Sequence, residues 1–480
     1  MELKDLLKKI KFAGNIDDCV IENITHDSRK VKPGTLFVAI KGFNDDGHNY
    51  IMDAVDRGAS AVMSNGRSLT NIGVPVIKVD DPRKSMSKIA AVFYQHPTKN
   101  IKITAVTGTN GKTSVTHIIN HIYKTADISC GTLGTLGFST PSGMISTGFT
   151  TPESIDLHQL FSTMLQGGIN HAIMEISSHA LDLHRVDDVD VDVAIFTNLT
   201  TEHLDYHGNM ENYFNAKLKL FQSLSKDKTS IINMDDPFGR RIKQSINTKI
   251  ITYSFSKNAD LYPKTVSLSM DGIQAELKFG SEVINIQSNL IGNYNLSNIM
   301  AAVSAALVQG VSVPMIEEAI KSMPPVSGRL ERIYSANPGN ILIDYAHTPD
   351  AYQQVISMLR NLNPPGTRII TFFGCGGNRD VLKRPIMGQI ASHLSDEIII
   401  TSDNPRFEKV ELICEDIARG ITKDNYTVIL NRKKALEHAL TKMDDNTLLL
   451  LLGKGREEYE VIGDEKIFHS DLDIIAGFQT

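Results

Sequence analysis

The clearest chemical signal in the chain is the stretch Ala-Val-Thr-Gly-Thr-Asn-Gly-Lys-Thr-Ser at positions 105–114. Glycines in such a turn let backbone N–H groups point at an anion, and a helix start adds partial positive charge. Lys112 can reach the terminal phosphates of a nucleotide, and the Thr113 hydroxyl can bind Mg²⁺. An ordinary glycine turn is the alternative. The first glycine of the common G-x-x-x-x-G-K-[ST] pattern would fall at Val106. This shorter loop predicts ATP or GTP use without naming a reaction.

Acids, histidines and a lysine follow this loop. Glu175 ends an apolar strand, a position at which Mg²⁺ is commonly bound beside a phosphate loop. The alternative is that Glu175 is an ordinary surface acid at the end of a strand. Residues 196–208 also follow an apolar strand and contain two acids and two histidines, a density that is unusual for a plain solvated loop. Lys217 lies beside the apolar stripe of an amphipathic helix. On this pattern alone, we expect its ammonium group to extend into solvent.

Four polar loops near the C-terminus each follow a predicted strand, at residues 344–350, 374–380, 402–406 and 453–457. Open α/β sheets bind ligands at the carboxyl ends of their strands, so these loops are predicted to form a second site. Neither glycine-rich loop fits G-x-G-x-x-G, which argues against a dinucleotide-dependent oxidoreductase. Three asparagines within 292–298 mark a helix start, where amide side chains either cap the helix or form hydrogen bonds with the edge of a nucleotide base.

The hydrophobic pattern predicts an α/β chain whose strands position these loops. Strands are predicted at residues 35–40, 61–63, 76–79, 101–106, 172–176, 191–196, 230–232, 341–344, 368–373, 397–401 and 448–452. Helices are predicted at 52–58 and from about 295 to 307, and alternation over 253–288 predicts a small antiparallel piece. Breaks near Pro97 and Pro324-Pro325 divide the chain into a mixed α/β domain (1–97), a central P-loop domain with a parallel sheet (98–327) and a doubly wound domain (328–480).

Composition narrows the class of protein. At about 150 residues per domain, 480 residues fit three domains. A net charge of −6 gives no reason to expect a nucleic acid or an anionic membrane as partner. The first ten residues are too charged for a signal peptide, and the leucine run 448–452 is too short to span a membrane. Four scattered cysteines fit reduced thiols, so we expect a cytoplasmic location without membrane insertion.

Taken together, these motifs resemble the Mur ligase family, ATP-dependent enzymes that add amino acids to bacterial cell-wall precursors. The resemblance covers nearly the whole chain and is strongest to members that add the third residue of the stem peptide. The shared motifs occur in this order: T-G-T-N-G-K-T, T-T-P-E, M-E-I-S-S-H-A-L, F-T-N-L-T-x-x-H-L-D-Y-H-G, Y-x-x-A-K, G-N-Y-N-x-x-N, D-Y-A-H-T-P-D, G-C-G-G-N-R-D, D-N-P-R and G-K-G-x-E. The family implies a uridine-nucleotide-binding N-terminal domain, a P-loop ATPase domain and a Rossmann-like C-terminal domain that binds the amino acid.

The resemblance also implies roles for individual residues. ATP binding is implied for Gly108, Thr109, Asn110, Gly111, Lys112, Thr113, Ser114, Asn295, Asn298, Arg329 and Asp344. Binding of the UDP-muramoyl-dipeptide is implied for His26, Ser28, Phe43, Asn44, Asp45, Thr150, Thr151, Ser177 and Arg185. Binding of the amino acid is implied for Arg379, Asp403, Asn404, Pro405, Arg406, Gly453 and Glu457. Lys112, Glu175, His203 and Lys217 are expected to be catalytic, and Thr113, Glu175, His203 and Lys217, the last as a carbamate, to hold Mg²⁺.

The chain departs from the family pattern at a few positions. Leu183 stands where many relatives have a glutamine, and Phe149 stands where some have an asparagine. Glu202 replaces the usual aspartate before His203, and Arg456 replaces a histidine. These changes leave the chemistry in place but loosen the expectations for single substrate contacts.

The incoming amino acid is predicted to be meso-diaminopimelate rather than L-lysine, because these two differ by a distal carboxylate. A guanidinium group offers a bidentate fork for that carboxylate, and Arg406 supplies one. The resemblance associates D-N-P-R with diaminopimelate-adding members, although Phe407 and Lys409 differ from its usual continuation. The alternative is that Arg406 pairs with a nearby acid such as Glu408.

The predicted reaction uses ATP to phosphorylate a substrate carboxylate, after which an amine attacks the acyl phosphate. Small molecules are the expected partners, and a monomer is the expected state. Two rivals remain: folylpolyglutamate synthetase, which lacks an N-terminal domain of this length, and a regulatory P-loop ATPase, which would not need the loops at 402–406 and 453–457.

Overall fold

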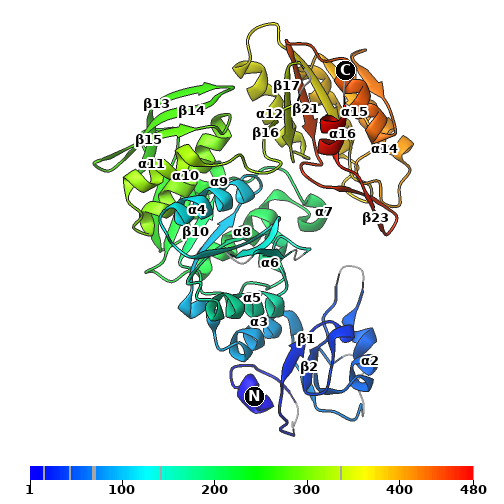
Figure 1. Ribbon diagram of the computed structural model, residues 1–480. Helices are drawn as coiled ribbons and strands as arrows, with labels where there is room; N and C mark the ends of the chain where they lie inside the picture. Colours follow the sequence, from blue (N-terminus) through cyan, green and yellow to red (C-terminus); the bar gives the residue numbers. More distant parts are fainter. Residues whose placement is uncertain are drawn as a thin grey trace.

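The computed structural model describes residues 1–13, 17–42, 45–66, 72–140, 143–145, 148–335 and 338–478. Three sheet-containing parts follow one another along the molecule, and the two chain termini lie in the two outer parts (Figure 1). The predicted α/β architecture with three domains is therefore confirmed.

The N-terminal part is built on a parallel sheet in the order β1-β2-β3-β4. Its strands are β1 (Asn23–Thr25), β2 (Thr35–Val38), β3 (Ala59–Ser64) and β4 (Val76–Lys78). Its helices are α1 (Leu3–Leu7), α2 (Ile51–Asp56) and α3 (Pro82–Phe93), with 3₁₀ turns η1 (Ser28–Lys30), η2 (Gly47–Tyr50) and η3 (Pro97–Asn100). The three strands predicted in this region are confirmed.

The central part contains an eleven-stranded sheet in the order β15-β14-β13-β12-β11-β10-β5-β9-β6-β7-β8. Its strands are β5 (Lys102–Thr107), β6 (Cys130–Gly134), β7 (Gly137–Thr140), β8 (Gly143–Ile145), β9 (His171–Glu175), β10 (Val193–Phe196), β11 (Thr229–Asn233), β12 (Lys249–Tyr253), β13 (Leu261–Ser269), β14 (Gly272–Phe279) and β15 (Glu282–Ser288). The predicted antiparallel piece is β13–β15. It is not a separate sheet, because Tyr253 of β12 pairs with Leu261 of β13.

Helices cover both faces of this sheet and bury two apolar layers. They are α4 (Lys112–Thr125), α5 (Ser154–Gln166), α6 (Ser178–Asp182), α7 (Leu204–His207), α8 (Met210–Ser223), α9 (Pro237–Gln244), α10 (Asn293–Val308) and α11 (Val313–Ser322). The Ala/Met-rich face predicted near residues 295–307 belongs to α10, which packs against α4 beside the phosphate loop.

The C-terminal part has a six-stranded sheet in the order β16-β17-β21-β18-β19-β20, in which only β16 pairs antiparallel. Its strands are β16 (Glu331–Ile333), β17 (Asn340–Asp344), β18 (Arg368–Phe373), β19 (Glu397–Ile400), β20 (Tyr426–Val428) and β21 (Thr447–Leu452), and β22 (Tyr459–Ile462) pairs with β23 (Glu465–Phe468) in a hairpin. Its helices are α12 (Pro349–Leu362), α13 (Lys383–Leu394), α14 (Val410–Ala418), α15 (Arg432–Thr441) and α16 (Asp471–Gly477). The leucine run forms β21 at the centre of this sheet, and each of its residues is buried.

Helix α5 joins the N-terminal and central parts. Ile155 belongs to the core of the first part, whereas Leu157 and Phe161 belong to a core of the second. At the start of this helix, the carboxylate of Glu153 pairs with Arg83 of α3 at 2.8 Å and with Arg185 at 2.9 Å. Because all three side chains are largely buried, this ion-pair triad fixes the junction by charge as well as by packing.

Within the described part of the chain, none of the helices combines the length and the apolar character needed to cross a bilayer.

The buried histidine of helix α5 generates a prediction about acid stability. His158 is fully buried, and burial followed by the nearby charge of His96 lowers its pKa from 6.5 to about 4. The unfolded chain therefore binds a proton between these values that the folded chain does not bind, so stability falls as the pH falls from 6.5 towards 4. We expect His158 to contribute a loss of about 2 kcal/mol in unfolding free energy between pH 7.5 and pH 5.

Urea unfolding of the wild type and of His158→Leu at both pH values measures this contribution. The leucine variant should lose less stability on acidification than the wild type does. An equal loss in the two proteins would contradict the prediction.

Candidate active site

The phosphate loop lies between strand β5 and helix α4, as predicted. Gly111 has a φ of +87°, and a Cβ atom there would lie 2.4 Å from Oδ1 of Asn298. A larger residue is therefore excluded by conformation and by space. The Nζ atom of Lys112 donates hydrogen bonds to the carbonyl oxygens of Gly108 at 2.9 Å and Thr109 at 2.8 Å. Its ammonium group thus folds back over the loop that would receive the phosphates.

The segment that follows strand β10 braces this loop. The backbone N–H of Asn110 donates to Oδ1 of Asn198 at 2.9 Å, and the Thr197 hydroxyl donates to the Asn110 carbonyl at 2.6 Å. The hydroxyl of Thr109 lies 3.1 Å from that of Tyr213. Ser114 is buried in the first turn of α4. The sheet explains the contacts, since β10 pairs directly with β5.

Glu175 ends β9, on the other side of β5, and its side chain is almost fully buried. The Thr113 hydroxyl lies 3.0 Å from both of its carboxylate oxygens. Thr135 donates to the same carboxylate through its backbone N–H at 3.0 Å and its hydroxyl at 3.1 Å. A hydroxyl and a carboxylate side by side at the end of the phosphate loop, where helix α4 begins, are the oxygen ligands that Mg²⁺ prefers.

Lys217 of α8 lies inside the protein, in contrast to the expectation from the helix pattern alone. Its side chain is 1% exposed, and Nζ donates to the carbonyl oxygen of Gly108 at 2.9 Å. Burial, with the nearby charge of Lys112, lowers the pKa of Lys217 well below its ordinary value. The snorkelling interpretation is therefore wrong. A buried amine with a depressed pKa is a nucleophile at neutral pH, as carbamate formation with CO₂ requires.

His203 adopts a left-handed backbone conformation with a φ of +56°, and its ring lies edge-on to the ring of Tyr213 in α8. Burial lowers its pKa to about 4, so the ring is a neutral potential ligand at physiological pH. The ring of His203 also contacts the ring of His179, and the two ring centroids are 4.8 Å apart. In the described ranges, His203 and Glu175 do not belong to any group of three or more His, Cys, Asp or Glu residues arranged to hold a metal ion. The pair of Thr113 and Glu175 fits Mg²⁺ on its own, and Lys217 can join only after it gains a carboxylate.

The residues expected to bind ATP from later in the chain surround the same loop. Oδ1 of Asn295 accepts from the Asn298 amide at 3.3 Å, and both asparagines are buried in the first turns of α10. Nη2 of Arg329 lies 3.4 Å from the Thr113 hydroxyl. The carboxylate of Asp344 accepts backbone hydrogen bonds from Leu330 at 2.7 Å and from Ala346, so its observed contacts hold the backbone next to Arg329.

The residues expected at the muramoyl-peptide lie at the edge of the same cluster. Thr151 donates its hydroxyl to the carbonyl of Glu175 at 3.0 Å and accepts from the Ser177 backbone N–H at 3.2 Å. Thr150 shares a hydroxyl contact of 3.1 Å with Thr135, and Nη1 of Arg185 donates to the Thr151 carbonyl at 2.9 Å. These contacts link the predicted acceptor site directly to the predicted metal ligand.

The residues expected to bind the uridine nucleotide lie in the N-terminal part. His26 is mostly buried, and its Nδ1 has no hydrogen-bond partner among the described residues. Ser28 is buried at the start of η1, and the carboxylate of Asp45 accepts from the Tyr50 hydroxyl at 3.4 Å. Phe43 and Asn44 lie outside the described residues.

The C-terminal loops predicted to bind the amino acid are brought together by the parallel sheet. The Asn404 amide donates to Oε2 of Glu457 at 2.9 Å, and its Oδ1 accepts from the Val461 backbone N–H at 2.9 Å. Gly453 leaves room for Asp403, because a Cβ atom there would lie 3.0 Å from Oδ2 of the aspartate. The loop continues through Pro405, whose carbonyl oxygen accepts a hydrogen bond from the backbone N–H of Glu408.

Arg406 is held in place without a carboxylate partner among the described residues. Its Nη1 donates to the carbonyl oxygens of Gly377 at 2.9 Å and Asn404 at 3.4 Å. Burial, together with the charge of the neighbouring Arg379, lowers its pKa. The alternative that Arg406 pairs with Glu408 is wrong, because Glu408 pairs instead with the buried Arg384 at 2.9 Å. Two neighbouring guanidinium groups, one of them without an ion-pair partner among the described residues, are suited to a carboxylate ligand.

Sequence reasoning missed several residues that shape the site. Thr135 holds Glu175 from a β-turn that carries no motif. Lys454 is 1% exposed and lies 3.6 Å from Asp403 and 3.9 Å from Glu457, so it balances the charge of both acids. Its position inside G-K-G-R-E was a signal that could have been used. His347 reaches across from the C-terminal part to within 3.3 Å of Glu202, a contact that no local pattern encodes.

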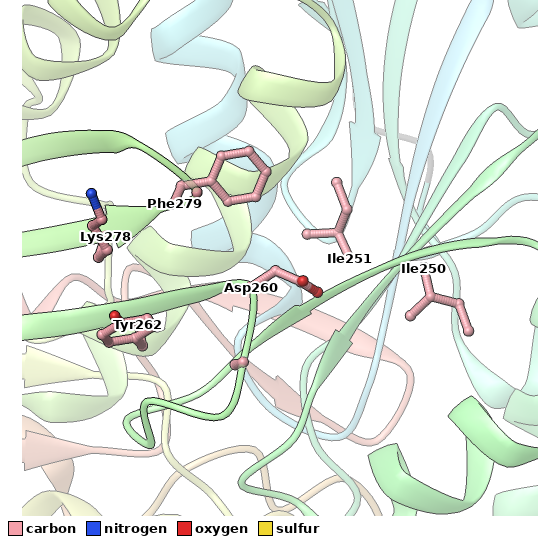
Figure 2. A pocket seen from close by; sticks show the side chains of 8 residues that line it. Ile250, Ile251, Asp260, Tyr262, Lys278 and Phe279 are labelled. Carbon is pink, nitrogen blue, oxygen red and sulfur yellow. The ribbon is translucent and has the colours of Figure 1, made fainter.

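A surface hollow of about 420 Å³ lies elsewhere, on the strands β12 to β14 (Figure 2). Its lining includes Ile251, Asp260, Tyr262, Lys278 and Phe279. None of the residues predicted to bind substrate belongs to it. The candidate site is instead assembled from loops of the three parts of the molecule.

Comparison with known proteins identifies the family of proteins to which the chain is similar. The chain matches three family models along its length: "Mur ligase family, catalytic domain" at residues 20–94, "Mur ligase middle domain" at 106–306 and "Mur ligase, glutamate ligase domain" at 328–455.

Relatives cover the chain from end to end. The protein is 40% identical to the UDP-N-acetylmuramoyl-L-alanyl-D-glutamate--2,6-diaminopimelate ligase of Clostridium botulinum, over 99% of each chain. A solved structure of a ligase with the same name aligns with a TM-score of 0.68 and 30% identity over 95% of this chain and 94% of the other. Folylpolyglutamate synthase of Mycobacterium tuberculosis, complexed with ADP and AMPPCP, shares the fold at a TM-score of 0.64 and 15% identity, covering 77% of this chain and 92% of its own. Full-length similarity at this level, on a fold and a loop arrangement of this kind, shows that the chain belongs to the Mur ligase family.

Proposed function

We propose that this protein is an ATP-dependent ligase that adds meso-2,6-diaminopimelate to UDP-N-acetylmuramoyl-L-alanyl-D-glutamate through an acyl phosphate, in the synthesis of peptidoglycan precursors. The name of the 40% identical relative supports this reaction and this amino acid. The observation that carries the proposal is the C-terminal site, in which the guanidinium group of Arg406 lies close to the charges of Arg379, Asp403 and Glu457. An amino acid whose distal end bears both an amine and a carboxylate satisfies both kinds of group.

The chemistry follows from the difficulty of joining a carboxylate to an amine in water. A carboxylate is a poor electrophile, so its oxygen must first become a phosphate leaving group. Attack of the substrate carboxylate on the γ-phosphorus of ATP forms the acyl phosphate and releases ADP. The neutral amine of the amino acid then attacks the acyl carbon, and inorganic phosphate leaves. Lys112 and the N–H groups of the loop would bind the charged phosphate oxygens during the first step.

Mg²⁺ is proposed to bind at Thr113 and Glu175, with a second ion held by Glu175, His203 and carbamoylated Lys217. When bound, these ions would neutralise charge on phosphate and carboxylate oxygens that must approach each other. Carbamoylation turns the Lys217 amine into an anion. An anion at this position would attract the ammonium group of Lys112, whose Nζ shares the carbonyl oxygen of Gly108 with Nζ of Lys217.

The two anionic substrates would reach this centre from different parts of the protein. The N-terminal residues His26, Ser28 and Asp45 are proposed to hold the uridine nucleotide, while Thr150, Thr151, Ser177 and Arg185 hold the muramoyl-peptide. Asn295 and Asn298 are proposed to bind the adenine end of ATP. The C-terminal part would then bring the amine to the acyl phosphate and keep water away from it. The need for ATP fits a cytoplasmic enzyme, and we propose that it acts as a monomer on small molecules.

Two alternatives can be tested in the same assay. Ligation of L-lysine would leave the two arginines without an anion, which disfavours it. A regulatory ATPase would hydrolyse ATP without either co-substrate. Measurement of ATP turnover with each substrate omitted in turn distinguishes them: the proposed ligase requires both the UDP-muramoyl-dipeptide and diaminopimelate, and turnover that needs neither would overturn the proposal.

Lys112 generates the next prediction. Lys112→Ala removes the ammonium group from the phosphate loop, so kcat should fall by about 10² to 10³-fold or more while the fold is kept. Lys124→Ala, in the exposed last turn of the same helix, is the matched control and should retain the wild-type rate. Turnover by Lys112→Ala within a few-fold of the wild type would refute the assignment of the loop.

Lys217 is expected to carry a carbamate in active enzyme. Activity should fall when CO₂ is removed rigorously and recover when bicarbonate is restored, and intact-mass or ¹³C-carbonate NMR measurements should detect the adduct. Lys217→Ala should be nearly inactive, with partial rescue by a short carboxylic acid that supplies the lost ligand. Lys219→Ala, two residues along on the same helix and paired with Asp182 at the surface, should remain active. Fully active enzyme with an unmodified Lys217 would contradict this prediction.

Arg406 is expected to select the amino acid. The wild type should have a kcat/KM for meso-diaminopimelate roughly 10³-fold or more above that for L-lysine, because lysine leaves a half-buried guanidinium group without its anion. Arg406→Ala should lose most of this preference by losing diaminopimelate activity. Arg419→Ala, an exposed arginine of the same sheet domain that pairs with Asp416, should not change it. Equal or better use of L-lysine by the wild type would contradict the assignment.

A further inference from the structure

The linker between the central and C-terminal parts lies against the loop that carries Glu457. Gly328 in the linker has a φ of +65°, and a Cβ atom there would lie 3.1 Å from the backbone nitrogen of Arg456 and 3.3 Å from Cα of Gly455. The backbones of the two segments are therefore in direct contact. Leu330 follows with a φ of +42°, which the hydrogen bond from its N–H to Asp344 maintains.

One ion pair fastens these segments together. Nε of Arg456 donates to Oε2 of Glu331 at 2.7 Å, and its Nη2 donates to Oε1 of the same carboxylate. Oε2 also accepts the backbone N–H of Gly328 at 2.8 Å. Glu331 is 9% exposed, so the pair is shielded on the acid side. A side-on guanidinium–carboxylate pair has a defined geometry that a single contact lacks.

The two segments lead to different candidate sites: the linker contacts the phosphate loop, and the loop that carries Arg456 belongs to the proposed amino-acid site. Arg329, next to Gly328, places Nη2 3.4 Å from the Thr113 hydroxyl of the phosphate loop, and its guanidinium carbon lies 4.9 Å from the ring centre of Tyr345. The hydroxyl of Tyr345 donates to Oε1 of Glu457 at 3.3 Å, immediately after Arg456. A displacement of the loop relative to the linker would therefore disturb both the nucleotide side and the amino-acid side.

We propose that Arg456 and Glu331 are a positioning pair that makes the amino-acid loop and the linker bearing Arg329 move as one body. The inference rests on the proposed ligase function. Neither residue touches the reacting atoms. Their effect is to keep the amine bound near Glu457 in line with the acyl phosphate formed at the phosphate loop, and small misplacements of this kind cost rate.

The test measures steady-state kinetics of Arg456→Met, Arg456→Lys, Glu331→Gln and the double variant Arg456→Met/Glu331→Gln. We expect Arg456→Met to lower kcat by about tenfold or more and to raise KM for diaminopimelate, with KM for the UDP-muramoyl-dipeptide within about twofold of wild type. Glu331→Gln should act in the same way, and the double variant should be no worse than the more impaired single one. Arg456→Lys, which keeps the charge without the fork, should be intermediate.

A matched control lies inside the central part. Arg241 and Glu211 also form a two-bond pair, at 2.9 and 2.6 Å, but they lie on helices α9 and α8 of the central part, neither of which belongs to the linker or to the amino-acid loop. Arg241→Met should leave all kinetic constants unchanged. A second readout is the affinity for a non-hydrolysable ATP analogue with and without diaminopimelate: any change that the amino acid produces in the wild type should be lost in Arg456→Met.

The outcomes separate this inference from the function on which it rests. If wild-type turnover does not require diaminopimelate, the proposed function fails. If the wild type behaves as proposed but Arg456→Met keeps its kcat and KM, the positioning role is overturned. Effects of the two single substitutions that multiply in the double variant would also overturn it. Thermal unfolding identifies a variant that does not fold, in which case Arg456→Lys and Glu331→Gln decide.

Discussion

Two lysine side-chain nitrogens converge on one carbonyl oxygen, and the central site is organised around this constraint. Lys112 and Lys217 both donate to Gly108 at 2.9 Å, and Lys217 is fully buried while Lys112 is partly buried. Burial lowers the pKa of each, and the charge of Lys112 lowers that of Lys217 further. Two cations this close in a medium of low polarity are stable only with anions nearby or with one of them neutral. Nucleotide phosphates would supply such anions, the depressed pKa of Lys217 favours its neutral amine, and the proposed carbamate would replace that amine with an anion.

Strand order explains how distant residues reach these lysines. Strand β5 lies between β9 and β10, and all three run parallel. Their carboxyl ends therefore open at one edge of the sheet, with the phosphate loop flanked by Glu175 on one side and by the segment beginning at Thr197 on the other. The same rule operates in the C-terminal sheet, where β18, β19 and β21 place the loops with Arg379, Arg406 and Glu457 together.

The central and C-terminal parts contact each other in two ways, by apolar packing in one region and by polar contacts between side chains in another. Ile291 and Tyr294, at the start of α10, pack against the apolar core of the C-terminal part. Closer to the phosphate loop, the links are polar: Arg329 contacts Thr113, and His347 contacts Glu202. Apolar packing holds a position with little directional preference, whereas hydrogen bonds and ion pairs depend on angle and distance. Alignment of the two candidate substrate sites is therefore expected to depend on the polar links.

The sequence by itself determined the class of fold, the order of the strands along the chain and the loops in which the chemistry resides. Hydrophobic periodicity and glycine placement are local properties, so the phosphate loop, Glu175 at a strand end and the buried β21 could be read directly. The resemblance to a family assigned Lys217 a role that its helix pattern argued against. Only the tertiary structure decided that this lysine is buried, that the β13–β15 strands extend the central sheet, and that Glu408 pairs with Arg384 and leaves Arg406 available to a ligand. Burial, sheet neighbours and ion-pair partners come from segments far apart in the chain, and the spacing of residues along one segment contains no information about them.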